Sequence, residues 1–295
     1  MPRAVGASCQ LNGMAGFAFV GRAVRLAALK TETWSALAVA IRSLLCGVAT
    51  LMAVSTSATA EVNLGVDSWG WHLSGSIQNQ GDRLDFGDDL SIQPRGSAVF
   101  HLGWQPQDAG WIPGIQGQTT RLVADGRNDV PAGTQFGPIT FTPGGPITGG
   151  PDTVTLISRA DLVDRDVLLH WRYEWAGWQW QPGVRVRQLD GEIVVRDEQG
   201  NSDQQGFDEW FPMLHLGAEL GADSAASLRF SADWISDGDN QAYEWSALLD
   251  WAAFGPLSLR LGWQVKRYEI LDAEADYRLS ALLAGPMVGL SVTIP

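Results

Sequence analysis

The chain has 295 residues, of which 45% are hydrophobic and 18% charged, and its formal net charge at pH 7 is −13. Nucleic-acid binding needs a basic surface, so this acidic balance excludes nucleic acid as an expected partner. Both cysteines, Cys9 and Cys46, lie near the N-terminus, so residues 61–295 carry neither a disulfide framework nor thiol chemistry.

The first 60 residues have the features of an export leader. Residues 36–54 are rich in Ala, Leu and Val, and their apolar core is too short for a spanning helix. The small residues Ala58 and Ala60 predict cleavage before Glu61. The leader carries a net charge of +4, so the predicted mature chain, residues 61–295, carries −17. Residues 1–35 are too long for an ordinary signal, which favours a mis-called translation start over a long leader or a targeting extension.

Apolar and polar residues then alternate in segments about ten residues long. The clearest segment runs from Leu257 to Lys266, with leucines, Trp263 and Val265 on one face and polar residues on the other. Because a tilted strand of this length crosses a bilayer, the pattern predicts a transmembrane antiparallel up-and-down β-barrel of about ten strands, or of eight if the first hairpin is misread. The ten predicted strands are 62–73, 97–105, 115–124, 155–173, 178–195, 207–220, 227–235, 242–253, 257–268 and 279–294.

The predicted connections alternate in length. Short turns are expected at 106–114, 174–177, 221–226 and 254–256, and mostly longer loops at 74–96, 125–154, 196–206, 236–241 and 269–278. This asymmetry is typical of an outer-membrane barrel of a Gram-negative bacterium with both termini on the periplasmic side. The loop 125–154 is rich in Gly and Pro and is predicted to be a mobile surface loop, which could fold into the lumen or engage a partner.

The first predicted strand is irregular. Its apolar residues shift from Val62, Leu64 and Val66 to Trp69, Trp71 and Leu73, a change that predicts a β-bulge.

Aromatic residues cluster at the ends of the predicted strands. Amphipathic rings gather at both interfaces of a bilayer, so they predict two girdles, whereas the alternative is the aromatic core of a soluble barrel. The girdle beside the short turns comprises Trp104, Trp111, Trp175, Trp178 and Trp251, and the girdle beside the long loops comprises Trp210, Trp234, Tyr243, Trp245 and Tyr268.

Several short stretches resemble an uncharacterised family of proteobacterial outer-membrane β-barrel proteins whose family label refers to a Gly-Gly motif. The matching stretches are Leu189–Ile193, Phe211–Leu214, Ala275–Tyr277, Gly285–Ser291 and Ile139–Phe141. The resemblance implies a small barrel in the outer membrane and carries over no catalytic or binding residue. The chain departs from such barrels at its end, where an aromatic residue is usual and Ile294 and Pro295 stand instead.

Charged residues of both signs fall on the face predicted to line the lumen. They are Arg172, Arg185, Arg187, Glu219, Arg229, Asp233, Glu244, Asp250, Arg260 and Lys266. Unpaired buried charge is costly, so opposite charges in a narrow lumen are expected to pair and to plug the barrel. The alternative is that they line a polar pore.

Carboxylates are dense in the long loops. They are Asp82, Asp85, Asp88, Asp89, Asp237, Asp239, Glu269, Asp272, Glu274 and Asp276. We expect a solvated surface and no cofactor or dedicated metal site, with weak binding of Ca²⁺ or Mg²⁺ as the alternative. The expected partners are outer-membrane lipid, lipopolysaccharide and the outer-membrane insertion machinery.

A hydrolytic site is the remaining candidate for chemistry. His72 lies near Ser68, Ser74 and Asp67, although such residues come together by chance in many sequences. We therefore expect no enzyme, and a non-enzymatic structural or surface-interaction role in the outer membrane. The first alternative is a narrow passive channel for small polar solutes or ions, and the second is a barrel hydrolase acting on lipid A or peptides.

Overall fold

The computed structural model describes residues 60–107, 111–142, 153–222, 224–237, 240–272 and 276–294. The predicted leader lies outside these residues, and of the predicted cleavage site only Ala60 and Glu61 are described, at the start of the first strand. In these ranges no helix is long and apolar enough to cross a membrane.

The described residues form strands joined by turns. The long strands are β1 (Ala60–Trp69), β2 (His72–Asn79), β5 (Ser97–Pro106), β6 (Gly114–Pro131), β9 (Thr153–His170), β11 (Trp178–Asp197), β12 (Ser202–Leu220), β13 (Ala226–Asp237), β14 (Asn240–Phe254), β15 (Leu257–Asp272) and β16 (Tyr277–Ile294). The short ones are β3 (Arg83–Asp85), β4 (Gln93–Pro94), β7 (Gln135–Phe136), β8 (Ile139–Thr140) and β10 (Tyr173–Trp175).

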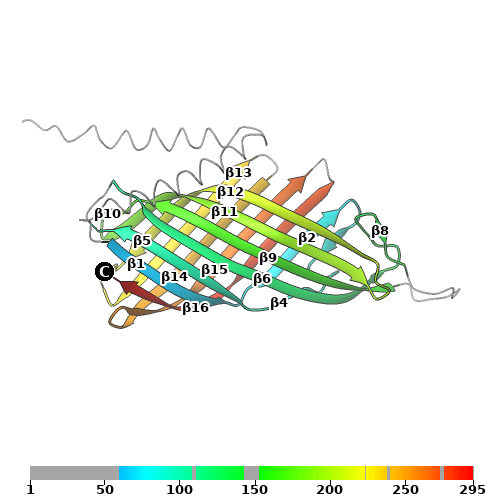
Figure 1. The fold of residues 1–295 in the computed structure, drawn as a ribbon, viewed down its shortest axis with the longest axis horizontal. Helices are drawn as coiled ribbons and strands as arrows, with labels where there is room; N and C mark the ends of the chain where they lie inside the picture. The colour runs from blue at the N-terminus through cyan, green and yellow to red at the C-terminus, as the bar shows by residue number, and fades with distance from the viewer. Residues whose placement is uncertain are drawn as a thin grey trace, which may run out of the picture. The chain divides into compact units, whose positions relative to one another are not determined.

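The long strands close into one antiparallel barrel (Figure 1). Consecutive strands pair from β5 round to β16, and β1 pairs with both β5 and β16. Because β1 and β2 lie end to end along β16, the barrel has ten strands, which confirms the predicted fold and strand number. Where β1 pairs with β5 on one side and β16 on the other, closure leaves no free sheet edge.

The predicted β-bulge in the first strand is wrong. Trp69 pairs with Met287 and His72 pairs with Ala284, so the register between the first strand and β16 is the same on both sides of the break. The break lies opposite Pro286, which has no N–H to donate, and Gly70 donates its own N–H to the Pro286 carbonyl at 3.0 Å. Trp69, Trp71 and Leu73 therefore point into the barrel, whereas Leu64 and Val66 point outward.

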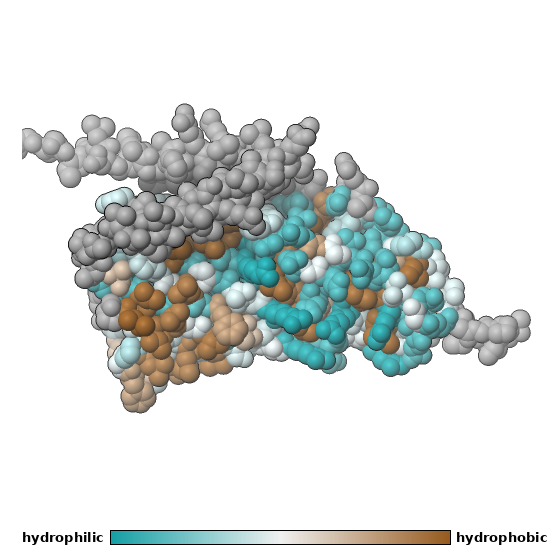
Figure 2. All heavy atoms as spheres, viewed as in Figure 1, coloured by the Kyte–Doolittle hydropathy of each residue, from teal (hydrophilic) through white to brown (hydrophobic). Residues whose placement is uncertain are grey.

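This change of side divides the barrel into two parts. In the lower barrel, next to the short turns, Ala60 and Ile294, the outward residues are apolar and most inward residues are polar. In the upper barrel, next to the long loops, the arrangement is reversed. In Figure 2 the lower barrel is at the left, where the visible face is mostly brown and apolar, and the upper barrel is toward the right, where the visible face is mostly teal and polar.

An apolar core fills the upper barrel. Its buried side chains include Trp69, Trp71, Leu73, Leu122, Leu156, Ala160, Leu189, Ile193, Phe207, Phe211, Met213, Ile270, Leu279 and Leu283. The first long loop adds Phe86 and Leu90, and the second adds Phe136 and Phe141, each with at most 1% of its surface exposed. The second loop was expected to be a mobile surface loop, but its described part continues β6, forms the β7–β8 hairpin and packs on this core.

The reversal also explains why the loops were predicted too long. β11 and β12 run to a turn at 198–201, β13 and β14 are separated only by 238–239, and β15 and β16 only by 273–276. In the upper barrel the strands carry their apolar residues inward, as strands of soluble proteins do. The outward apolar face that predicted the strands ends below this part, so the predicted strands were too short.

Candidate functional site

Two networks of buried polar side chains fill the lumen of the lower barrel. The upper network, close beneath the apolar core, consists of Asp164, Asp166, Arg185, Arg187, His215, Asp233, Glu244, Gln264, Lys266 and Tyr268. The lower network, nearer the short turns, consists of Asp67, His101, Glu219, Arg229, Asp250 and Arg260. Most members are inward residues on the barrel strands, because successive side chains of a strand point to opposite faces.

Arg187 lies at the centre of the upper network. Its guanidinium is 3.3 Å from both Asp164 and Asp166, and it also pairs with Glu244. The Lys266 ammonium is 2.7 Å from Asp164 and 3.6 Å from Glu244. Both cations have fully buried side chains, so these carboxylates supply the counter-charge that burial requires.

Uncharged side chains donate further hydrogen bonds to Asp164 and Glu244. The Tyr268 hydroxyl donates to Asp164 at 2.9 Å, and the Gln264 amide donates to Glu244 at 2.6 Å. The Lys266 ammonium also lies 5.6 Å from the centre of the Trp69 ring, which belongs to the apolar core. The upper network is thereby joined directly to the core above it.

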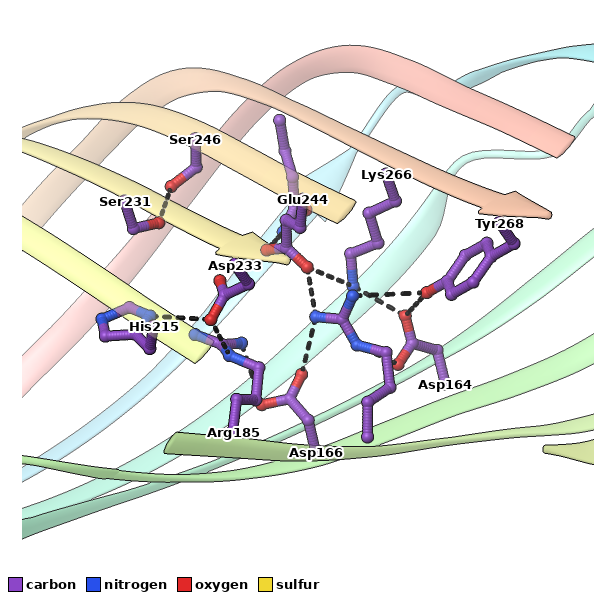
Figure 3. A network of polar contacts seen from close by, with 12 residues as sticks. Asp164, Asp166, Arg185, His215, Ser231, Asp233, Glu244, Ser246, Lys266 and Tyr268 are labelled. Carbon is purple, nitrogen blue, oxygen red and sulfur yellow. Dashed lines mark hydrogen bonds and ion pairs between the residues drawn. The ribbon is translucent and has the colours of Figure 1, made fainter. Parts of the chain in front are cut away.

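The upper network extends across the lumen to β12 and β13 (Figure 3). Arg185 donates to Asp166 and to Asp233, each at 3.0 Å, and thus bridges β9 and β13. The His215 imidazole holds the same Asp233 oxygen through Nδ1 at 2.7 Å. The Arg185–Asp233 contact joins β11 to β13, which are not neighbours in the sheet, whereas His215 and Asp233 face each other on the paired strands β12 and β13.

The lower network is organised around Arg260. This guanidinium donates to Asp250 at 2.8 Å and to Asp67 at 3.3 Å, and lies 3.1 Å from Nε2 of His101. Arg229 lies 3.5 Å from Asp250 and pairs with Glu219 at 3.4 Å. In each network carboxylates exceed Arg and Lys by one, so opposite charges balance to within one unit, and each network also contains one histidine.

Exposure rises toward the short turns. The Arg187 side chain is fully buried, that of Arg260 is 6% exposed, that of Arg229 is 31% exposed and that of Arg172 is 36% exposed. The lumen is therefore wettest at the end of the short turns and dry at the apolar core. Between the two networks lies a polar cavity of about 50 Å³ bordered by Gln116, Gln118, Gln181, His215, Ser231, Ser246 and other members of both networks. That volume holds a few water molecules and no larger solute.

The structure brings nine of the ten predicted lumen residues into these networks. Arg172 is the exception, because it follows the end of β9 and lies 3.7 Å from Glu61 at the lower mouth of the barrel. Sequence reasoning did not assign Asp67, Asp164 or Asp166 to the cluster. The alternation on β9 was followed only from residue 167, and three more residues toward the N-terminus would have placed Asp164 and Asp166 inward.

Nine of the ten predicted girdle aromatics lie at least partly exposed on the described part of the chain. Trp111 and Trp175 are the most exposed, at 75% and 72%, and lie at the short turns. Tyr268 is placed differently from the prediction, since it is 1% exposed and belongs to the upper network. Tyr268 is two residues from Lys266 on β15, so their side chains lie on the same face of the strand, and the sequence already indicated that this face is inward.

The carboxylates of the first acidic loop stabilise the loop itself. Asp85 accepts hydrogen bonds from the backbone of Gly87 and Asp88, Asp89 accepts one from the backbone of Asp85, and Asp82 accepts one from Gln135. Within the described ranges no group of three His, Cys, Asp or Glu side chains could hold a metal ion. Asp239 and Glu274 lie outside those ranges.

The proposed hydrolytic residues are not brought together. Ser68 and His72 are exposed on the outer face of the first strand, whereas Asp67 is buried in the lumen and pairs with His101 and Arg260.

Two groups in the upper barrel have shifted acidity. Burial raises the pKa of Glu209, and the negative charges of Asp208 and Asp272 add to this shift. Burial also raises the pKa of Tyr277, with a further contribution from Glu209. Proton uptake by Glu209 is therefore favoured in the folded barrel.

No protein-family model and no curated protein matches the chain. Among solved structures, the chain is similar to the outer membrane protease OmpT from Escherichia coli, with 8% sequence identity, 81% of this chain and 100% of that chain covered, and a TM-score of 0.48. It is also similar to the translocator domain of the autotransporter NalP from Neisseria meningitidis, with 12% identity, 89% and 99% coverage and a TM-score of 0.40. A third similar structure is the outer membrane protein OprG from Pseudomonas aeruginosa, with 10% identity, 80% and 96% coverage and a TM-score of 0.32.

Proposed function

We propose that this chain is an integral outer-membrane barrel with a non-enzymatic structural or surface-interaction role, and that its lumen does not conduct. The lower barrel lies in the membrane, in contact with outer-membrane lipid and lipopolysaccharide, after assembly by the outer-membrane insertion machinery. The upper barrel projects beyond the bilayer and presents its polar wall to the outside.

The outer surface of the lower barrel supports the membrane assignment. Large apolar side chains are exposed there on successive strands, among them Phe100, Leu216, Phe230, Leu261 and Leu290. On β12 the apolar face runs from Trp210 to Leu220, which at the usual rise and tilt of a barrel strand covers about 25 Å. Exposed apolar surface on this scale is stable only against lipid or another apolar partner.

The filled lumen is the observation that carries the proposed role. A permeating ion would have to pass both charge networks and then the apolar core, where Trp71, Phe86 and Phe211 are buried. A small barrel whose interior is occupied by side chains is a packed structure and not a channel. We therefore assign the ion pairs to cross-bracing of the wall.

Planar-bilayer recording tests this proposal. The refolded chain beginning at Glu61 is expected to give no discrete openings, under conditions in which an open porin conducts. An Arg185→Ala/Arg260→Ala variant serves as the comparison, since it removes one central cation from each network. Discrete wild-type openings whose size or ion selectivity changes in this variant would show that the charges line a pore, and the channel alternative would replace our proposal.

The absence of a catalytic role is part of the same proposal. What supports it is the separation of Ser68 and His72 from Asp67 by the barrel wall. Cleavage of lipid A or of a peptide by the wild-type protein, lost in His72→Ala, would contradict it.

A further inference from the structure

A groove interrupts the outer wall where the apolar outer face of the lower barrel, which we call the apolar belt, meets the polar upper barrel. It has a volume of about 300 Å³ and is bordered by Gly96, Ser97, Ala98, Phe100, Thr119, Thr120, Arg121, Val123 and Val163. It forms because β5 begins only at Ser97 and pairs with β6 from Val99 onward, while β4 covers β6 next at Pro94. We call it the wall groove.

The wall groove is apolar at its base and basic at its rim. Phe100, Ala98 and Val163 supply apolar surface. Arg121 borders the groove and is held by Asp161, to which its Nε and Nη2 donate at 2.8 and 2.6 Å. This pairing fixes the guanidinium plane and leaves Nη1 without a hydrogen bond to the described residues.

Arg165 also lies beside the groove, and unlike Arg121 its charge has no partner among the described residues. It is exposed, and it has no hydrogen bond or ion pair within the part of the chain that the structure describes. It pairs across the sheet with Thr119, a groove residue that itself pairs with Phe100. Along β9 the next outward residues below Arg165 are Val167 and Leu169 of the belt, so this unpaired charge is placed where the belt ends.

Charged side chains of both signs lie on the outer face here. Arg95 pairs with Asp125, and Arg121 and Arg159 pair with Asp161, whereas Arg165 has no ion pair among the described residues. Asp190 lies across the sheet from Val163, so the charge that distinguishes this place is the unpaired Arg165 and not a general positive excess. An unpaired arginine at the edge of a lipid-facing belt is matched in charge and depth by a lipid phosphate.

We propose that the wall groove binds a phosphorylated membrane lipid, with the phosphate held by Arg165 and Arg121 and an apolar segment of the lipid against Phe100. The inference rests on the proposed membrane insertion of the lower barrel. It adds a defined lipid contact on one side of the barrel, on β5, β6 and β9, in place of a uniform lipid annulus.

Lipid retention by the protein purified from the membrane fraction tests the proposal. The detergent-solubilised protein is titrated with phosphatidic acid or with diacylglycerol of the same acyl chains, and bound lipid is counted by native mass spectrometry. Wild type is expected to retain phosphatidic acid at least about tenfold better than diacylglycerol, the range given by one or two charge-assisted hydrogen bonds. Arg165→Gln/Arg121→Gln is expected to abolish this preference.

Two further variants separate the groove from general charge effects. Arg196→Gln removes an exposed arginine high on the wall and is expected to leave the preference unchanged. Ala98→Trp fills the groove without altering charge and is expected to weaken phosphatidic acid retention. Folding of every variant is checked by the shift in gel mobility between heated and unheated samples.

The failures of the two proposals are distinguishable. Three outcomes would overturn the lipid site and leave the membrane assignment intact. The first is a folded wild type that retains both lipids equally, and the second is a loss of the phosphatidic acid preference in Arg196→Gln as large as in Arg165→Gln/Arg121→Gln. The third is displacement of the lipid by an equal concentration of inorganic phosphate. Absence of the protein from the membrane fraction would overturn the proposed function itself.

Discussion

Replacement of Arg187 by methionine tests whether the upper network is a dry plug. Methionine preserves much of the side-chain volume but removes the charge that pairs with Asp164, Asp166 and Glu244. Breaking a buried ion pair by deleting one partner costs about 3–5 kcal/mol, because the remaining charge is left uncompensated in a poorly solvated site.

The remaining contacts place the expected loss at the lower end of this range. After the replacement, Asp166 keeps Arg185 at 3.0 Å and Asp164 keeps Lys266 at 2.7 Å. Glu244 keeps only Lys266, at 3.6 Å, together with the amide of Gln264. One carboxylate is thus left poorly paired, and we expect the free energy of unfolding to fall by about 3 kcal/mol.

Urea unfolding in detergent micelles, followed by tryptophan fluorescence and by the heat-dependent gel shift, measures this loss. Arg127→Met is the matched control, since Arg127 pairs with Glu198 on the outside and both side chains are more than half exposed. We expect it to cost under about 1 kcal/mol. Adding Glu244→Gln to Arg187→Met should recover about 1 kcal/mol, because it removes the poorly paired charge. A loss for Arg187→Met no larger than for Arg127→Met would refute the dry plug and indicate a solvated pore.

Three other changes test the remaining parts of the structure. Leu261→Arg puts a charge in the belt and is expected to reduce stability in lipid by about 2–4 kcal/mol, whereas Gln204→Arg on the polar upper wall should change it by under about 0.5 kcal/mol; equal effects would argue against a lipid-facing belt. Phe86→Ala leaves a cavity in the upper core and is expected to cost about 3–5 kcal/mol in urea unfolding, while a near-neutral result would mean that the first loop does not pack in the lumen. The raised pKa of Glu209 means that its contribution to stability is complete below the ordinary glutamate pKa and is lost as pH rises through the raised value. Glu209→Gln should therefore flatten the fall in stability as pH rises above the ordinary glutamate pKa. An unchanged pH profile would assign that fall to other groups.

The strand number and the lining of the lower barrel could be predicted because both follow from a two-residue period. Arg185 and Arg260 each lie between outward apolar residues, and Lys266 continues the alternation of Arg260 and Gln264 on β15, so their inward direction was readable from the sequence. Their partners were harder to predict. Arg187 meets Glu244, 57 positions away, and Arg260 meets Asp67, 193 positions away, and such pairings depend on closure and register of the barrel.

The upper barrel was missed for a different reason. An alternating strand has the same sequence signature whether its apolar face points to lipid or to a core, and only the parity changes between the two. Trp69 and Trp71 have the opposite parity to Leu64 and Val66, and this change was interpreted as a bulge. The register across Pro286 shows that the strand continues and that its surroundings change instead.

In the membrane-inserted barrel that we propose, the change of parity marks the level at which the barrel leaves the lipid. Below that level lipid would cover the apolar outer face, and the polar residues inside must satisfy one another because little water would reach them. Above it water would surround the outer face, so the sheet is stable only if apolar side chains fill its interior. Inside the lumen, the change from polar to apolar side chains falls between Arg187 and Leu189 on β11 and between His215 and Met213 on β12, while the outward apolar face of β12 continues to Trp210. The networks are deepest directly under this level, where Lys266 meets Trp69, and this contact is where polar cross-bracing and the apolar core hold the same part of the wall.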